Sequence, residues 1–199
     1  MKFKNHHDIF ECRRAGVSAE VIRGIIAAES SKLVMIERLW NGWFPDGYEI
    51  YRKDDISHWR FYDSPDDPQR IIQSRAGLTG NPPAFVPDLR DIPATVADLC
   101  RRGMLFAVAK ERSAPGVMYL VKARKLSPRS FLAAELDADG MWTEGARFYF
   151  DAVTSIGIGG RYVAFYERLF GASAPGGSAG RGGENADAAQ KTFFDAARS

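Results

Sequence analysis

The sequence is poor in cysteine and contains no long apolar run. Its two cysteines, Cys12 and Cys100, lie far apart and belong to no CxxC or cysteine–histidine spacing, so we expect two reduced thiols and no disulfide framework. No stretch approaches the roughly 18–20 apolar residues of a membrane-spanning helix. The N-terminus also lacks the apolar core of a signal peptide. These absences predict a cytoplasmic protein without membrane contact.

A strong excess of either charge is also missing. The 27 lysines and arginines nearly balance the 25 aspartates and glutamates, which leaves a net charge of +2. A dedicated nucleic-acid-binding domain usually shows a clear basic excess, so composition argues against one, although a local basic patch stays compatible with it. With 45% hydrophobic residues the chain can bury a sizeable core.

Catalytic motifs are absent as well. The sequence contains no nucleophile elbow, P-loop, HExxH motif or strand-linked GxGxxG. Two local groups of potential metal ligands occur, namely His6, His7, Asp8 and Cys12 near the N-terminus, and Asp63, Asp66 and Asp67 around two prolines. We interpret them as a solvated terminus and a solvated turn, since neither has the ligand spacing of a known site. The sequence therefore predicts no enzyme activity, no cofactor and no metal.

The sequence does contain an internal duplication. Two runs of strand-like segments recur at a separation of 97 residues. This offset pairs Ser30 with Ser127, Leu39 with Leu136, Asp54 with Asp151, Ile56 with Val153, and Ser57 with Thr154. Such a repeat predicts two copies of one structural unit.

The first unit is expected over residues 1–75. An incomplete apolar spacing predicts a short helix over 5–16. Enrichment in β-branched and aromatic residues then predicts four strands, with a tight turn at 30–32 and a loop at 41–47. These strands are expected over 21–29, 33–40, 48–53 and 57–62. Residues 76–90, rich in proline and glycine, form the predicted linker.

The second unit is expected over residues 91–170. It opens with the clearest helix signal of the chain, over 91–103, where Asp91 can cap, Pro93 suits the first turn and Gly103 can end the helix. Strands follow over 104–110, 117–126, 131–136, 148–150 and 154–158, and a closing helix over 161–170. Residues 171–199 are dominated by Gly, Ala and Ser and predict a disordered tail.

This order of elements resembles that of an Sm-like small β-barrel. The stretch Phe150-Asp-Ala-Val-Thr-Ser-Ile resembles the passage from the fourth to the fifth Sm-like strand, and Tyr51-Arg-Lys-Asp-Asp-Ile-Ser is similar to the same piece of bacterial Hfq-like proteins. Both units also resemble a bacterial family of uncharacterised role that carries such units in tandem. The resemblance covers residues 1–75 and 91–170. It implies a mainly β protein with short helices, built from two Sm-like or SH3-like barrels in a pseudo-symmetric pair.

The residues that bind RNA in Sm-like proteins do not carry over. The family uses an Asp-x-aromatic-x-Asn loop, whereas the matching turns here are Ser30-Ser-Lys-Leu-Val and Ser127-Pro-Arg-Ser-Phe, in which only Phe131 could stack on a base. The Hfq-like Lys-His pair is replaced by Lys53 and Asp54. Because function depends on the site and not on the fold, the resemblance implies the barrel more strongly than RNA binding.

Two groups of residues are candidates for contact with a partner. Lys122 and Arg124 alternate with apolar residues, which predicts one basic strand face with Arg129 at the adjoining turn and Phe131 beside it. The alternative is a solvated face that protects a sheet edge. The aromatic residues Trp40, Trp43 and Phe44 can cap the first unit, dock on the second, or stack on bases.

From these observations we predict a non-catalytic binding or scaffold protein that engages a protein partner, with oligomers able to form through strand edges. The alternative is RNA or single-stranded nucleic-acid binding through the basic strand face of the second unit.

Overall fold

The computed structural model describes residues 2–3, 7–78, 80 and 82–171. The predicted tail lies outside the described residues except for Gly171. No helix in the described part of the chain is both long enough and apolar enough to cross a membrane.

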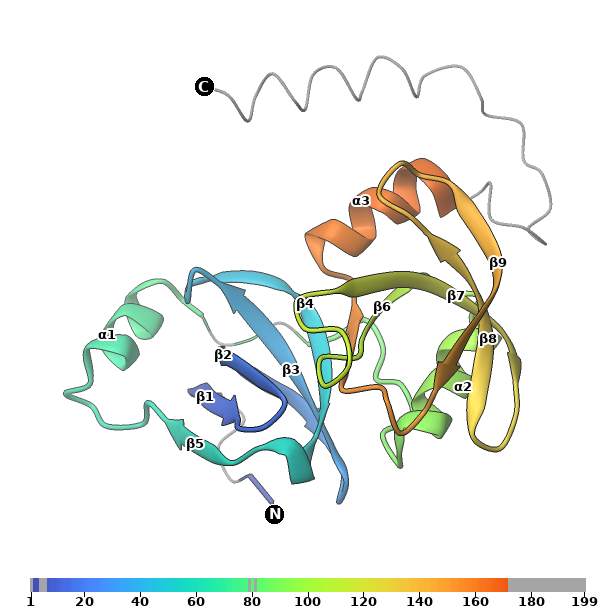
Figure 1. The fold of residues 1–199 in the computed structure, drawn as a ribbon. Coiled ribbons are helices and arrows are strands. Elements are labelled where there is room, and N and C mark those ends of the chain that lie inside the picture. Colours follow the sequence, from blue (N-terminus) through green and yellow to red (C-terminus); the bar gives the residue numbers. More distant parts are fainter. Residues whose placement is uncertain (1, 4–6, 79, 81, 172–199) are drawn as a thin grey trace.

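The described residues form ten strands, three α-helices and one 3₁₀ turn (Figure 1). In chain order these elements are β1 (Ile9–Arg14), β2 (Ser18–Glu29), β3 (Leu33–Trp40), β4 (Phe44–Arg52), η1 (Lys53–Asp55), β5 (His58–Phe61), α1 (Pro68–Arg75), α2 (Ile92–Arg101), β6 (Phe106–Ala109), β7 (Met118–Leu126), β8 (Ser130–Leu136), β9 (Trp142–Tyr149), β10 (Ser155–Ile158) and α3 (Arg161–Phe170). The prediction of a mainly β protein with short helices is confirmed.

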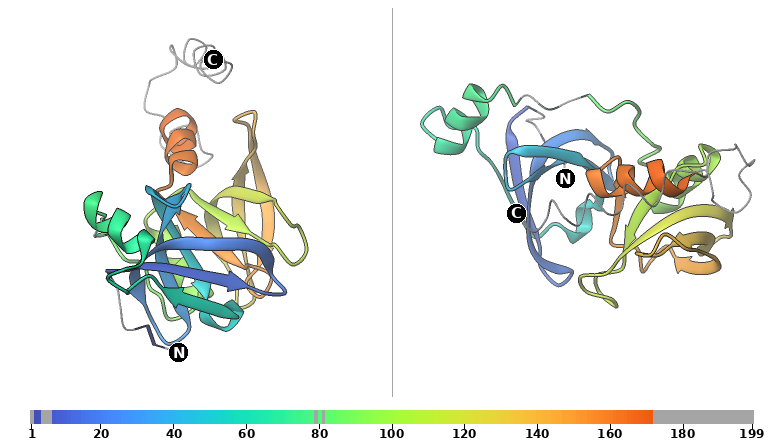
Figure 2. Two further views of the ribbon diagram at one scale, coloured as in Figure 1. Left: turned by 90° about the vertical axis from the view of Figure 1, so that its left-hand side faces the viewer. Right: turned by 90° about the horizontal axis from the view of Figure 1, so that it is seen from above.

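All ten strands belong to one antiparallel sheet in the order β5-β1-β2-β3-β4-β10-β6-β7-β8-β9. The sheet is not closed, because β5 and β9 each have one neighbour and end it. Figures 1 and 2 show the first five strands on one side of the molecule and the last five, with α2 and α3, on the other. We call these two parts the first half and the second half.

Strand pairing repeats between the two halves with the offset predicted from the sequence. Gly24 lies opposite Arg38 in the β2·β3 pair, and Val121 lies opposite Glu135 in the β7·β8 pair, each 97 positions later. The irregularity that follows Ile26 in β2 also recurs after Ala123 in β7. Because even a β-bulge is repeated, the two halves share one strand architecture in detail.

The hydrophobic core continues from one half into the other. Phe10, Cys12, Ile22 and neighbouring residues form a cluster inside the first half. A larger cluster joins α2 and the strands of the second half to Leu33 and Met35 of the first. The two halves meet where β10 pairs with β4, so backbone hydrogen bonds and apolar packing act at the same junction.

Local signals predicted two helices correctly. Asp91 accepts a hydrogen bond from the Ala94 backbone N–H at 3.0 Å and caps α2, with Pro93 in the first turn. Gly103 follows the helix with φ at 63°, a conformation that glycine adopts without steric cost. The closing helix α3 has the predicted bounds.

Other predictions were wrong. The segment predicted as a helix over 5–16 contains β1, which pairs with both β2 and β5. Phe10 and Cys12 are buried while Glu11 and Arg13 face outward, the period-two alternation of a strand. Helix α1 was not predicted, although Asp67 accepts from the Gln69 N–H at 2.8 Å and caps it. Strand β4 begins inside the loop predicted over 41–47, and β9 begins at Trp142, before the strand predicted over 148–150.

Candidate functional site

Two cations of the predicted basic face of β7 have partners within the chain. Lys122 donates from Nζ to the Gly171 carbonyl at 2.9 Å, and burial lowers its pKa. Arg124 forms an ion pair with Glu144 at 3.9 Å, at the bulge that interrupts the alternation of the strand. Arg129 is exposed at the β7–β8 turn. The three cations therefore differ in their surroundings, since Lys122 is half-buried, Arg124 is ion-paired and Arg129 is exposed.

Phe131 is fully buried, which corrects its prediction as a stacking surface. Its ring stacks on Phe148, with centroids 5.2 Å apart, and lies 5.7 Å from the ring of Phe150. The residue belongs to the large core cluster. A side chain in this position supports the sheet and presents no face to a base.

The aromatic loop of the first half forms a hairpin between β3 and β4. Trp43 packs on Ile9, Leu39 and Tyr62 and so caps the first half. Trp40, 49% exposed, lies under the Arg161 guanidinium of α3 at 4.5 Å. Phe44, 58% exposed, lies 6.1 Å from Trp40 between ring centroids.

This hairpin also contacts the second half. Asp46 in β4 accepts hydrogen bonds from the backbone N–H of Arg161 at 2.9 Å and from its Nε at 3.2 Å. The loop thus both covers its own half and docks on the other, two of the three roles expected from the sequence.

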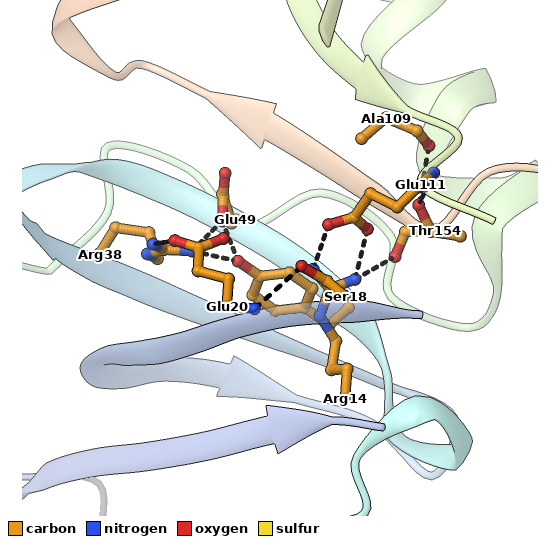
Figure 3. A network of polar contacts seen from close by, with 9 residues as sticks. Arg14, Ser18, Glu20, Arg38, Glu49, Ala109, Glu111 and Thr154 are labelled. Atoms are coloured by element: carbon orange, nitrogen blue, oxygen red, sulfur yellow. Dashed lines mark hydrogen bonds and ion pairs between the residues drawn. The ribbon is translucent and has the colours of Figure 1, made fainter. Parts of the chain in front are cut away.

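A buried ion pair at the junction of the halves was not predicted (Figure 3). Arg14, at the end of β1, is 1% exposed, and its two terminal amino groups each lie 2.6 Å from an oxygen of Glu111. The guanidinium stacks on the Tyr51 ring at 4.5 Å and donates to the Thr154 carbonyl at 3.4 Å. The ion-paired residues are 97 positions apart and come from different halves, so no local pattern in the sequence indicates the contact.

Glu111 is held in place from the second half. Its backbone N–H donates to Thr154 Oγ1 at 3.0 Å, and that hydroxyl donates to the Ala109 carbonyl at 3.1 Å. Burial alone would raise the pKa of Glu111, but hydrogen bonds and the charge of Arg14 hold it below its usual value of 4.5. The carboxylate is therefore ionised at neutral pH and forms a charged clamp with Arg14.

A second arginine organises the neighbouring carboxylates. Arg38 donates at 2.6 Å to both Glu49 and the Tyr51 hydroxyl, and at 2.5 Å to Glu20. The Tyr51 hydroxyl in turn donates to Glu49. Burial raises the pKa of Glu49 despite the positive charge of Arg38. Figure 3 shows this group beside the Arg14–Glu111 clamp.

The two groups border a hollow of about 350 Å³ between the halves. Each of its carboxylates, on Glu20, Glu49 and Glu111, is bound by an arginine. No cluster of three or more metal-ligating side chains occurs among the described residues. We interpret the arrangement as a junction that holds the halves together, because ion pairing already occupies the acids that general acid–base chemistry would need.

Comparison of the chain with known protein families, curated proteins and solved structures finds no match.

Acid is expected to weaken the clamp. The folded-state pKa of Glu111 lies below 4.5, so its stabilising contribution is complete above the unfolded-state pKa and is lost as pH falls through the folded-state value. Denaturant unfolding between about pH 6 and pH 3 should show this loss for the natural chain and a smaller loss for Glu111→Gln. Identical pH profiles for the two proteins would contradict this assignment.

Proposed function

We propose that the chain is a non-catalytic scaffold protein that binds a protein partner through the open edges of its sheet, and that this partner is a second copy of the chain. The observation that carries the proposal is the β4·β10 pair. It joins the fourth strand of the first half to the fifth strand of the second half. The equivalent strands of the opposite halves, β9 and β5, are the two that end the sheet.

We further propose that each half is an Sm-like unit. In support, each half places its fifth strand beside its first, with the orders β5-β1-β2-β3-β4 and β10-β6-β7-β8-β9. A 3₁₀ turn, η1, separates the fourth and fifth strands of the first half. Free thiols at Cys12 and Cys100 suit a reducing compartment, so we place the protein in the cytoplasm.

The register of the internal junction predicts the register between copies. In the β4·β10 pair, Ile50 lies opposite Ile156 and Glu49 opposite Gly157. Applying the 97-residue offset to each strand places the β5 residues of one copy opposite the β9 residues of the next. The expected pairs are His58 with Phe148, Trp59 with Arg147, Arg60 with Ala146, and Phe61 with Gly145.

The two edges are chemically compatible in this register. Neither strand contains proline, so each can donate backbone hydrogen bonds to a new neighbour. Trp59 is 47% exposed and would gain the Arg147 guanidinium over its ring, a cation–π contact. The small residues Ala146 and Gly145 leave space for Arg60 and Phe61. Because the two edges differ, repeated pairing is head-to-tail and generates either a ring or a filament.

Site-specific disulfide formation tests the pairing. Opposed residues of an antiparallel pair lie about 4.5–5.5 Å apart at Cα, within the reach of a disulfide. We expect a chain carrying Trp59→Cys, mixed with a chain carrying Arg147→Cys, to give a crosslinked dimer under mild oxidation. Burial raises the pKa of the Cys12 thiol to about 12 and that of Cys100 above its usual value, so the native thiols react slowly.

The matched control carries Thr143→Cys, an exposed position on the same strand, about 13 Å away from Arg147 along the strand. Equal crosslinking of the control, or a mass of one chain at every concentration in light scattering, would contradict the proposal. Turnover in an unbiased substrate screen would contradict its non-catalytic part. RNA binding through Lys122, Arg124 and Arg129 stays a prediction, and the contacts of Lys122 with Gly171 and of Arg124 with Glu144 do not favour it.

A further inference from the structure

The outer surface of the first half carries a hollow beside the β5 edge, and among its described lining residues only Arg60 belongs to that edge. Its volume is about 500 Å³, and it is bordered by β1, β2, β3, β5 and the β3–β4 turn. The charged residues around it are Arg13, Arg23, Arg38, Arg60, Glu11 and Glu20. Four arginines against two glutamates give this surface a formal excess of two positive charges.

Strand register brings these side chains together. Arg60 in β5 lies opposite Glu11 in β1, and Glu11 lies opposite Arg23 in β2. The next residue of β1 on the same face is Arg13, which lies opposite His58 in β5 and Val21 in β2. Side chains two residues apart on a strand share a face. The cross-strand row that contains Glu11 and the row that contains Arg13 therefore lie side by side and form the floor of the hollow.

Glu11 fixes two of the arginines. It accepts hydrogen bonds from Nε of Arg23 at 2.6 Å, from Nε of Arg60 at 3.1 Å and from the Tyr62 hydroxyl at 2.7 Å. Burial would raise the pKa of Glu11, but these hydrogen bonds and the arginine charges hold it below its usual value. The carboxylate is therefore charged at neutral pH, and the guanidinium groups are oriented before any ligand arrives.

Arg13 is an arginine of the floor that Glu11 does not bind. Within the described part of the chain its guanidinium forms no hydrogen bond or ion pair. Nη1 of Arg23 lies next to the Gly42 backbone, 3.6 Å from the position of a Cβ there. A planar guanidinium on each of two adjacent strands suits the bidentate recognition of phosphate oxygens.

The rim adds an aromatic surface. Trp40 is half exposed, has the Arg161 guanidinium over its ring at 4.5 Å, and borders the hollow beside Asn41 and Gly42. Asn41 has φ at 51°, the single non-glycine residue with positive φ among those described, and such strained turns concentrate at functional sites. The hollow has the volume of a small-molecule site and is too large for a bare phosphate.

We propose that this hollow binds a nucleoside monophosphate, with its phosphate on Arg13 and Arg23 and its base against Trp40. The ligand is a small molecule, because a hollow of about 500 Å³ matches the size of one bound nucleotide and not of a longer strand.

Isothermal titration of the full chain with AMP, GMP, CMP, UMP, adenosine and inorganic phosphate tests the proposal. We expect saturable binding of at least one monophosphate, weaker binding of phosphate, and none of adenosine. Arg13→Gln and Arg23→Gln should each weaken binding about tenfold, since each removes charged hydrogen bonds. Trp40→Ala should weaken binding of the monophosphate and leave that of phosphate unchanged.

Arg129→Gln is the matched control, because it removes an exposed arginine far from the hollow in the sequence and should leave binding unchanged. Thermal unfolding of each variant verifies its fold, and a folded Arg13→Gln variant with unchanged affinity would overturn the proposal. Failure of all four monophosphates to bind, or binding only to single-stranded RNA, would overturn it as well.

Discussion

Replacing Glu111 by alanine is expected to lower the free energy of unfolding by about 3–5 kcal/mol, the usual cost of breaking a buried ion pair from one side. Arg14 is almost completely buried and directs both terminal amino groups at this carboxylate. Its Nε already lacks a hydrogen-bond partner among the described residues. Without Glu111 the charge would keep only the Thr154 carbonyl and the Tyr51 ring.

Urea unfolding measures this loss of stability. Glu111→Ala is compared with a surface variant and with a double variant. Glu144→Ala removes the exposed partner of Arg124 and should cost no more than about 1 kcal/mol. Combining Glu111→Ala with Arg14→Met removes both charges, so this double variant should recover much of the lost stability. A Glu111→Ala protein as stable as Glu144→Ala would show that the clamp contributes nothing to the junction.

The clamp belongs to a wider set of contacts between the halves. Arg52 in β4 donates to the Phe150 carbonyl at 2.6 Å and to the Val153 carbonyl at 3.3 Å. Arg112 pairs with Asp55, and Arg161 pairs with Asp46. These contacts surround a β4·β10 pair whose Ile50 and Ile156 are fully buried. The halves are therefore joined by strand pairing, apolar packing and ion pairs together, which favours unfolding as one cooperative unit.

Elements with local causes could be predicted from the sequence. Asp91, Pro93 and Gly103 define both ends of α2 within one short stretch. The 97-residue repeat predicted two copies of one unit because both copies carry matching strand and turn residues, and the β2·β3 and β7·β8 registers repeat with that offset. The segment over 5–16 was misread because a six-residue strand offers few positions for period counting, and because its two partner strands, β2 and β5, lie elsewhere in the sequence.

The candidate sites depend on long-range register and could not be predicted in the same way. A shift of one residue would turn Arg13 from the outer face to the core. Pairing of β1 with β5 also brings Arg60 next to Glu11, although they are far apart in the chain. The same dependence on register explains why Phe131 was wrongly predicted as a base-stacking residue. The alternation along β8 does not reveal which of its faces packs on Phe148 and Phe150.

Replacing Phe131 by alanine is expected to cost about 3–5 kcal/mol of unfolding free energy, the range for a buried phenylalanine. Its ring contacts Phe106, Phe148 and Phe150 and has no exposed surface. The loss of stability has two parts, the apolar area that is no longer buried and the cavity left by the ring. The cavity persists because the closely packed side chains around it relax only in part. Urea unfolding of the variant gives the value.

Phe44→Ala is the matched control, since it removes the same ring from an exposed position on β4, where substitutions usually change stability by no more than about 0.5 kcal/mol. The free energy of unfolding of Phe131→Leu should lie between those of Phe131→Ala and Phe44→Ala, because leucine retains most of the side-chain volume. Equal stability of Phe131→Ala and Phe44→Ala would mean that the Phe131 ring faces solvent, as a base-stacking residue must. A loss of the expected size would instead fix Phe131 as part of the packing that holds β8 and β9 together at the end of the sheet.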